Sequence, residues 1–185
     1  MINDVTGRIK AEMVDTFNEV FTWFNVKDEL LFYNPENRGW NINNVLEHIS
    51  LTNHYLLILI RKGVNRSIER SQKKDYAGML NNYNLDWDKI KMIGEHNSFE
   101  WNRPQHMEPS GNMPVGEIKL KLESQLSECL DLLSSIKNGE GVLHSTMMSV
   151  NGIGKIDVYH YIYFLVQHTR RHLTQMEKIK AEFEK

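Results

Sequence analysis

The chain has 185 residues, of which 41% are hydrophobic and 25% are charged, the balance of a globular protein with a substantial core. Its 22 basic and 24 acidic residues give a net charge of −2 without a dominant basic tract, so we expect no nucleic-acid partner. The most apolar run, residues 55–60, is too short to span a bilayer, and the N-terminus lacks a secretory apolar core, so we expect a cytoplasmic protein without a membrane partner.

Helical periodicity runs through most of the chain, and its length suits one domain over residues 1–185. Apolar residues recur every three or four positions across residues 4–25, which predicts the first helix. The second helix is predicted to start at Asn41, whose side-chain oxygen can accept a free backbone N–H of the first turn, and to end near Gly63.

Two further helices are predicted in the second half of the chain. One starts at about Pro114, because proline is tolerated in a first turn, and ends before Asn138. The other starts near Asp157, a suitable N-cap, and continues to about Phe183. Because no segment has a convincing period-two strand pattern, the predicted fold class is all-α, a four-helix bundle with long crossover connections.

Two long connectors join the predicted helices. Residues 64–113 are long for a loop in a compact domain, which indicates a functional lid or additional secondary structure, and the sequence assigns them no role. A short helix is expected within residues 85–93, and residues 95–106 either cover a pocket or pack over the bundle. In residues 143–156 the glycines indicate turns rather than a phosphate-binding loop, because no strand precedes them.

Two histidines, His168 and His172, lie four residues apart on the apolar stripe of the last predicted helix. This spacing stacks both imidazoles on one side of the helix, where they can converge on one metal ion. The spacing also arises readily by chance, so two interpretations are open: core histidines bonded to carbonyls or carboxylates, or metal ligands.

A third histidine occupies a similar position in another helix. His48 lies near the start of the helix that Asn41 caps, on the inward-facing stripe. Three inward imidazoles with a fourth position open are the ligand count of a catalytic zinc-type site. The sequence therefore favours a metal site formed by His48, His168 and His172.

The neighbours of these histidines receive separate predictions. Glu47 is expected to be a solvated helix residue, and Arg170 and Arg171 are expected to be surface charges. Gln175 either lies beside the site as a hydrogen-bond partner or is an ordinary polar residue at a helix interface. No catalytic acid, base or nucleophile is assigned.

Other candidate ligands and nucleophiles have a structural explanation. The single cysteine, Cys129, lies within a helical pattern and is expected to be a buried apolar residue that can form no intrachain disulfide. His54 is expected on another face of its helix, and His160 is expected to be partly exposed, about two turns before His168.

Two sequence blocks resemble the motifs of DinB-like proteins. Residues 40–49, WNINNVLEHI, resemble the W-S-x-x-E-x-L-x-H-[LI] motif, although Asn41 replaces the usual serine and Asn44 stands where an acid is common. Residues 164–176, FLVQHTRRHLTQM, resemble the H-x-x-x-H-x-x-Q-[IM] helix. The order of the histidines and the separation of the two blocks also resemble the family.

The resemblance implies a DinB-like four-helix bundle with a three-histidine metal site. Its ligands would be His48, His168 and His172, and its metal would be a divalent ion such as zinc, nickel or iron. Some members of the family are metal-dependent transferases that join a low-molecular-weight thiol to an electrophile, and members are often dimers.

Three functions follow as hypotheses. The first is a thiol-dependent S-transferase that acts on small electrophiles in detoxification or a stress response through a metal held by three histidines, and the resemblance implies that it is a homodimer. The second is a metal-dependent hydrolase that uses metal-bound hydroxide. The third is a non-catalytic, stress-related binding protein in which the histidines only support the bundle. The ligand set permits both reactions, so it does not choose between them.

Overall fold

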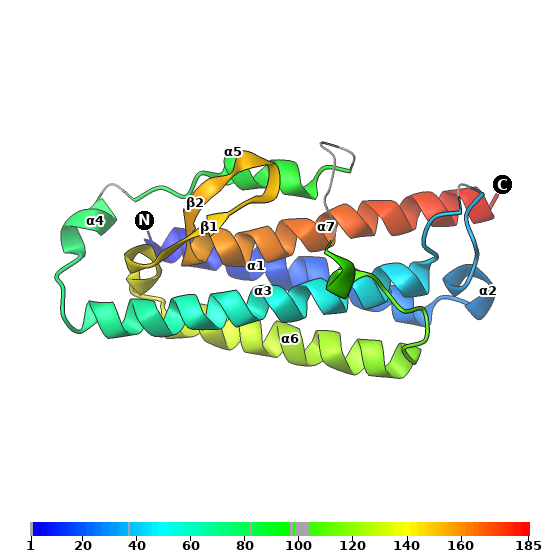
Figure 1. The fold of residues 1–185 in the computed structure, drawn as a ribbon, viewed down its shortest axis with the longest axis horizontal. Coiled ribbons are helices and arrows are strands. Elements are labelled where there is room, and N and C mark those ends of the chain that lie inside the picture. The colour runs from blue at the N-terminus through cyan, green and yellow to red at the C-terminus, as the bar shows by residue number, and fades with distance from the viewer. Residues whose placement is uncertain (1, 37, 82, 97, 99–103) are drawn as a thin grey trace.

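Four long helices form a bundle around one core (Figure 1). They are α1 (Ile2–Thr22), α3 (Ile42–Ser71), α6 (Val115–Ser135) and α7 (Val158–Phe183). The computed structural model describes residues 2–36, 38–81, 83–96, 98 and 104–185. Helices α1 and α3 each pack against both α6 and α7, so the four helices enclose the core as a ring. The predicted all-α class and the four long helices are confirmed.

The short elements lie in the connections between these helices. They are η1 (Trp23–Asn25), α2 (Asp28–Leu31), α4 (Ala77–Asn81), α5 (Trp87–Lys91), η2 (Met92–Gly94), η3 (Gln105–Met107), η4 (Glu140–Leu143), β1 (Ser145–Met148), η5 (Val150–Gly152) and β2 (Gly154–Asp157). Helices α1 and α7 run in one direction and α3 and α6 in the other, so the chain between α3 and α6 travels the length of the bundle (Figure 1). This crossover carries the expected short helix, α5 followed by η2.

Side-chain caps set the starts of the two helices that carry the histidines. Asn41 Oδ1 accepts the backbone N–H of Asn44 at 2.9 Å, and Asp157 Oδ1 accepts that of His160 at 3.0 Å. Each contact satisfies one of the backbone donors that a first helical turn leaves without an intrahelical partner. Both predicted starts are confirmed. Within the described ranges, no helix is long and apolar enough to cross a membrane.

The predicted end of the second helix at Gly63 is wrong, because α3 continues to Ser71. Gly63 lies inside the helix, where an added Cβ would stand 3.0 Å from Val158 Cγ2. The glycine therefore lets α3 approach the first turn of α7 closely. Its role is packing between helices, and it does not terminate the helix.

The sequence predicted no strands, and this prediction is also wrong, because β1 and β2 form a small antiparallel hairpin. Its register pairs Ser145 with Asp157 and Met148 with Gly154. Each strand has only four residues, which is too short for a period-two pattern to stand out from the sequence. The prediction of turns is confirmed, since Gly152 has a φ of +65° between the strands.

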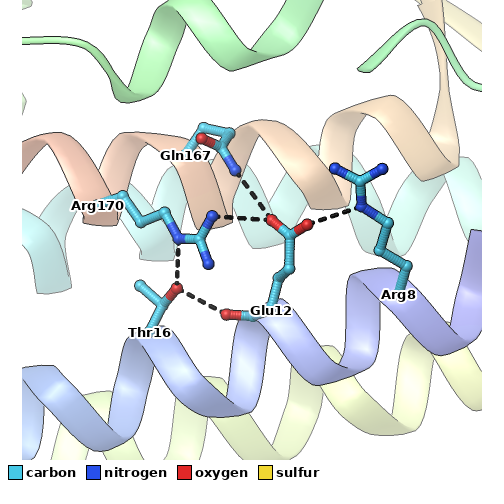
Figure 2. Close-up of polar contacts among 5 residues, drawn as sticks. All are labelled: Arg8, Glu12, Thr16, Gln167 and Arg170. Atoms are coloured by element: carbon cyan, nitrogen blue, oxygen red, sulfur yellow. Dashed lines mark hydrogen bonds and ion pairs between the residues drawn. The ribbon is translucent and has the colours of Figure 1, made fainter. Parts of the chain in front are cut away.

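A polar cluster ties α1 to α7 (Figure 2). The carboxylate of Glu12 accepts hydrogen bonds from Arg8 Nε at 2.8 Å, Arg170 Nη1 at 2.9 Å and Gln167 Nε2 at 3.4 Å. Arg170 Nε also donates to Thr16 Oγ1 at 3.1 Å. The Arg170 side chain is 40% exposed, so the expected surface charge is partly buried and holds two helices together.

Candidate metal centre

The antiparallel arrangement of α3 and α7 brings the three histidines to one level. Both helices rise by the same distance per residue, and they run in opposite directions. The numbers of two residues that face each other therefore add up to nearly the same value all along the pair. The close approach of Gly63 to Val158 therefore places His48 opposite the turn that holds His172. The ring centroids of these two histidines are 4.7 Å apart, and that of His168 is 5.4 Å from that of His48.

The spacing of the imidazole nitrogens fits a divalent metal. One nitrogen from each of His48, His168 and His172 lies within 4.8 Å of the other two. The Nε2 atoms of His168 and His172 are 3.2 Å apart. Two nitrogens bound to one tetrahedral zinc at its usual bond lengths stand about 3.3 Å apart. The pair on α7 could therefore hold an ion almost as it stands, with His48 as the third ligand.

Hydrogen bonds to the outer nitrogens orient two of the rings. His48 Nδ1 lies 2.7 Å from the carbonyl oxygen of Met107, and His172 Nδ1 lies 2.9 Å from Gln175 Oε1. Because a carbonyl oxygen only accepts, each Nδ1 carries the proton and each Nε2 presents its lone pair to the centre. Of the two interpretations of Gln175, the structure supports the hydrogen-bond partner beside the site.

Burial keeps the imidazoles of His168 and His172 in the neutral form that binds metals. His48, His168 and His172 are 3%, 3% and 2% exposed. Burial lowers the pKa of His168 and of His172 well below the ordinary value of 6.5, and the other histidines and Arg171 lower both further. Arg171, expected on the surface, is half-buried. Neutral imidazole is the ligand form, so the site needs no proton release from these two rings before it takes an ion.

Aromatic rings and one hydroxyl surround the cluster. The Trp40 ring centroid lies 4.7 Å from that of His48, and Phe164 stacks on His168 with an interplanar angle of 10°. Thr52 Oγ1 lies 3.4 Å from His48 Nε2, one helical turn along α3. The rings limit the access of water, and the Thr52 hydroxyl lies at the inward edge of His48.

The prediction that Glu47 is solvated is wrong, because its side chain is buried at 1% exposure. Its carboxylate accepts hydrogen bonds from the backbone N–H and hydroxyl of Ser110, both at 2.8 Å, and from the backbone N–H of Gly111 at 2.9 Å. Helical periodicity in the sequence predicts only which face of α3 packs against other helices. The side of α3 that carries Glu47 is covered by an irregular segment instead. Of the proposed cover over residues 95–106, residues 97 and 99–103 lie outside the described residues.

The remaining candidates lie away from the cluster. His54 is exposed, and His160 is half-buried against Asp157 at 2.8 Å, so neither joins the other three histidines. Cys129 is buried, and burial raises the pKa of its thiol to about 12, which leaves it inert as a nucleophile. The structural interpretations of these residues are confirmed.

A separate groove of about 620 Å³ lies between α1, η2 and α7. It is lined in part by Trp23, Lys91, Arg170 and Thr174. Arg170 and Thr174 project from nearly the opposite side of α7 from His168, because successive residues turn by about 100°. None of the three histidines lines this groove.

The bundle and its cluster define a helical protein with a three-histidine centre that could hold a divalent ion. A family model described as the DinB superfamily matches residues 14–176, and the chain belongs to that superfamily. YuaE, an uncharacterized protein of Bacillus subtilis (strain 168), is 24% identical over 177 residues, which cover 91% of this chain and 98% of YuaE. No solved structure matched the chain significantly. The predicted family is thereby confirmed.

Proposed function

We propose that the protein is a metal-dependent enzyme, a thiol S-transferase for small electrophiles, in which His48, His168 and His172 hold one zinc, nickel or iron ion. The observation that supports this proposal is the convergence of three buried imidazoles, with the Nε2 atoms of the α7 pair 3.2 Å apart. Membership of the DinB superfamily and the all-histidine donor set are compatible with a borderline divalent ion. A low-molecular-weight thiol would be the second substrate.

The residues of the chain would prepare this chemistry by orientation and exclusion of water. A bound divalent ion would supply Lewis acidity that favours the thiolate form of a thiol at neutral pH. Met107 and Gln175 fix the His48 and His172 rings, and Trp40 and Phe164 limit solvent around the centre. The reaction forms a carbon–sulfur bond while the leaving group takes the electron pair of the broken bond and the thiol proton passes to solvent.

The assay for this proposal uses metal-loaded protein with a panel of low-molecular-weight thiols and alkylating or epoxide electrophiles. Loss of free thiol and the thioether product are measured by mass spectrometry. The wild type should form thioether faster than the uncatalysed mixture, and His168→Ala should not. The exposed His54 supplies the matched control, because His54→Ala should keep the full rate. Turnover of esters or amides without added thiol would instead assign the hydrolase that uses metal-bound hydroxide.

The burial of the cluster favours a second candidate, a non-catalytic binding protein of a stress response. Each imidazole is at most 3% exposed, as expected for a metal or histidine cluster that only supports the bundle. In that case metal loading should raise the unfolding temperature, while no thiol or ester in the panel should be consumed above background.

The proposed enzyme would act as a homodimer. Large apolar side chains that the described bundle leaves exposed could supply an interface, among them Leu59 at 43% and Leu120 at 67% exposure. Light scattering after size-exclusion chromatography should give twice the chain mass of 21.8 kDa. A mass equal to that of one chain would contradict the dimer.

A further inference from the structure

One irregular segment, residues 104–112, runs along α3 beside the histidine cluster, and we name it the strap. It includes η3 and leads to the start of α6 (Figure 1). Its Met107 carbonyl accepts the Nδ1–H of His48 at 2.7 Å. Its His106 ring lies against Tyr55 of α3, with ring centroids 4.3 Å apart. The strap therefore supplies the acceptor that sets the orientation of one candidate ligand.

The strap is fastened to α3 by Glu47, the residue next to His48. Ser110 donates both its backbone N–H and its hydroxyl to Glu47 Oε1, and Gly111 donates its backbone N–H to Oε2. Gly111 has a φ of +72°, and a Cβ there would stand 3.0 Å from Asn44 Nδ2. A glycine is thus required where the backbone turns to present its N–H to the carboxylate.

We propose that Glu47 is a positioning residue of the metal centre, which fastens the strap so that the Met107 carbonyl holds His48 in the Nδ1–H tautomer with Nε2 directed inward. The inference rests on the proposed metal site for its purpose. Its structural step, from Glu47 through the strap to His48, stands on the hydrogen bonds alone.

The chemistry of the contact requires a carboxylate. Glu47 faces three donors and is 1% exposed, so both of its oxygens must accept. Glutamine has nearly the same shape, but its NH₂ group would face a donor of the strap. Glu47→Gln should therefore loosen Ser110 or Gly111 without opening a cavity, and the Met107 acceptor should shift with them.

A matched control exists elsewhere in the bundle. Glu140 is also a buried glutamate, at 8% exposure, and its carboxylate accepts two hydrogen bonds from Asn138 at 3.0 Å. Among the described residues, its hydrogen bonds do not involve the strap or the histidine cluster. Glu140→Gln therefore reproduces the loss of a buried carboxylate without the proposed effect on His48.

The first measurement uses the metal-free protein. Two-dimensional ¹H–¹⁵N spectra of the histidine rings report which ring nitrogen carries the proton, and His48→Gln assigns the signal. In the wild type and in Glu140→Gln, His48 should be a single tautomer with Nδ1 protonated. In Glu47→Gln it should become a mixture, and Ser110→Ala, which removes one of the three donors and leaves the carboxylate, should give a smaller shift.

The second measurement is metal affinity, from titration with cobalt(II), whose absorption reports the geometry of the ligands. Loss of an outer hydrogen-bond partner of a ligating histidine lowers metal affinity by about 10- to 100-fold. Glu47→Gln should weaken cobalt binding within this range and alter the spectrum, whereas Glu140→Gln should do neither.

Glu47→Gln with an unchanged His48 tautomer and unchanged cobalt affinity would overturn the proposal, even if the variant were less stable. A wild type that binds no cobalt would refute the proposed metal site instead, and the tautomer of His48 in the metal-free variants would still decide the positioning role. Since Ser110→Ala removes a single hydroxyl at an exposed residue, it keeps the test open if Glu47→Gln does not fold.

Discussion

Acid should destabilise the metal-free protein through His168 and His172. Burial, followed by the charges of neighbouring histidines and Arg171, lowers the pKa of both imidazoles in the folded state. In the unfolded chain they return to the ordinary value of 6.5. Below that pH the unfolded state binds more protons than the folded state, so the free energy of unfolding is highest above pH 6.5 and decreases as the pH falls.

The size of this effect follows from linkage. Protonation stabilises an unfolded imidazole of ordinary pKa by about 1.4 kcal/mol as the pH falls from about 7.5 to about 5.5. The two groups can therefore lower the free energy of unfolding by at most about 3 kcal/mol over this range. Because both folded pKa values are well below the ordinary one, we expect most of that loss.

Urea denaturation in the presence of a chelator measures the effect at the two pH values. The double variant His168→Gln, His172→Gln is the control and should lose most of the pH dependence. His144 contributes separately to the pH dependence of the free energy of unfolding, because burial also lowers its pKa. The variant His144→Gln removes that contribution. A loss below about 1 kcal/mol in the wild type, or an equal loss in the double variant, would refute the reasoning.

Three further predictions test individual contacts. Cys129 should not react with a thiol reagent in the native state and should react fully in urea, because burial raises its pKa to about 12. Gln175→Ala should weaken metal binding by about tenfold or more in a chelator competition, because His172 Nδ1 loses its acceptor. Glu12→Gln should lower the free energy of unfolding in urea by about 1 kcal/mol and leave metal binding unchanged, since its partner Arg170 lies on the far side of α7.

Each of these predictions has a contradicting outcome. Rapid labelling of native Cys129 would mean that the centre of α6 opens readily. Unchanged metal affinity in Gln175→Ala would mean that the hydrogen bond between His172 and Gln175 does not contribute to metal binding. Weaker metal binding in Glu12→Gln would mean that the polar cluster of Figure 2 is coupled to the histidines.

The sequence predicted the features that repeat along a helix or cap it. Asn41 and Asp157 lie where the structure begins α3 and α7, and apolar periodicity placed His48, His168 and His172 on inward faces. The common level of the three histidines was not predictable from these patterns, because it depends on the antiparallel register of α3 and α7.

The features that the sequence did not predict depend on contacts between distant segments. Glu47 is one position away from His48 and off the inward stripe, and the strap that bonds to its carboxylate is a contact from a distant segment. Glycine is a common residue at the end of a helix, yet Gly63 lies inside α3, where its lack of a side chain leaves room for Val158. Neither contact has a local signal in the sequence.

Metal content is the most direct test of the central claim that three histidines hold one ion. Elemental mass spectrometry of untagged protein should find about one divalent ion per chain in the wild type and in His54→Ala, and none in His168→Ala. The exposed His54 controls for the loss of a histidine as such. Absence of metal from the wild type after incubation with zinc, nickel and iron, or full retention in His168→Ala, would contradict the account.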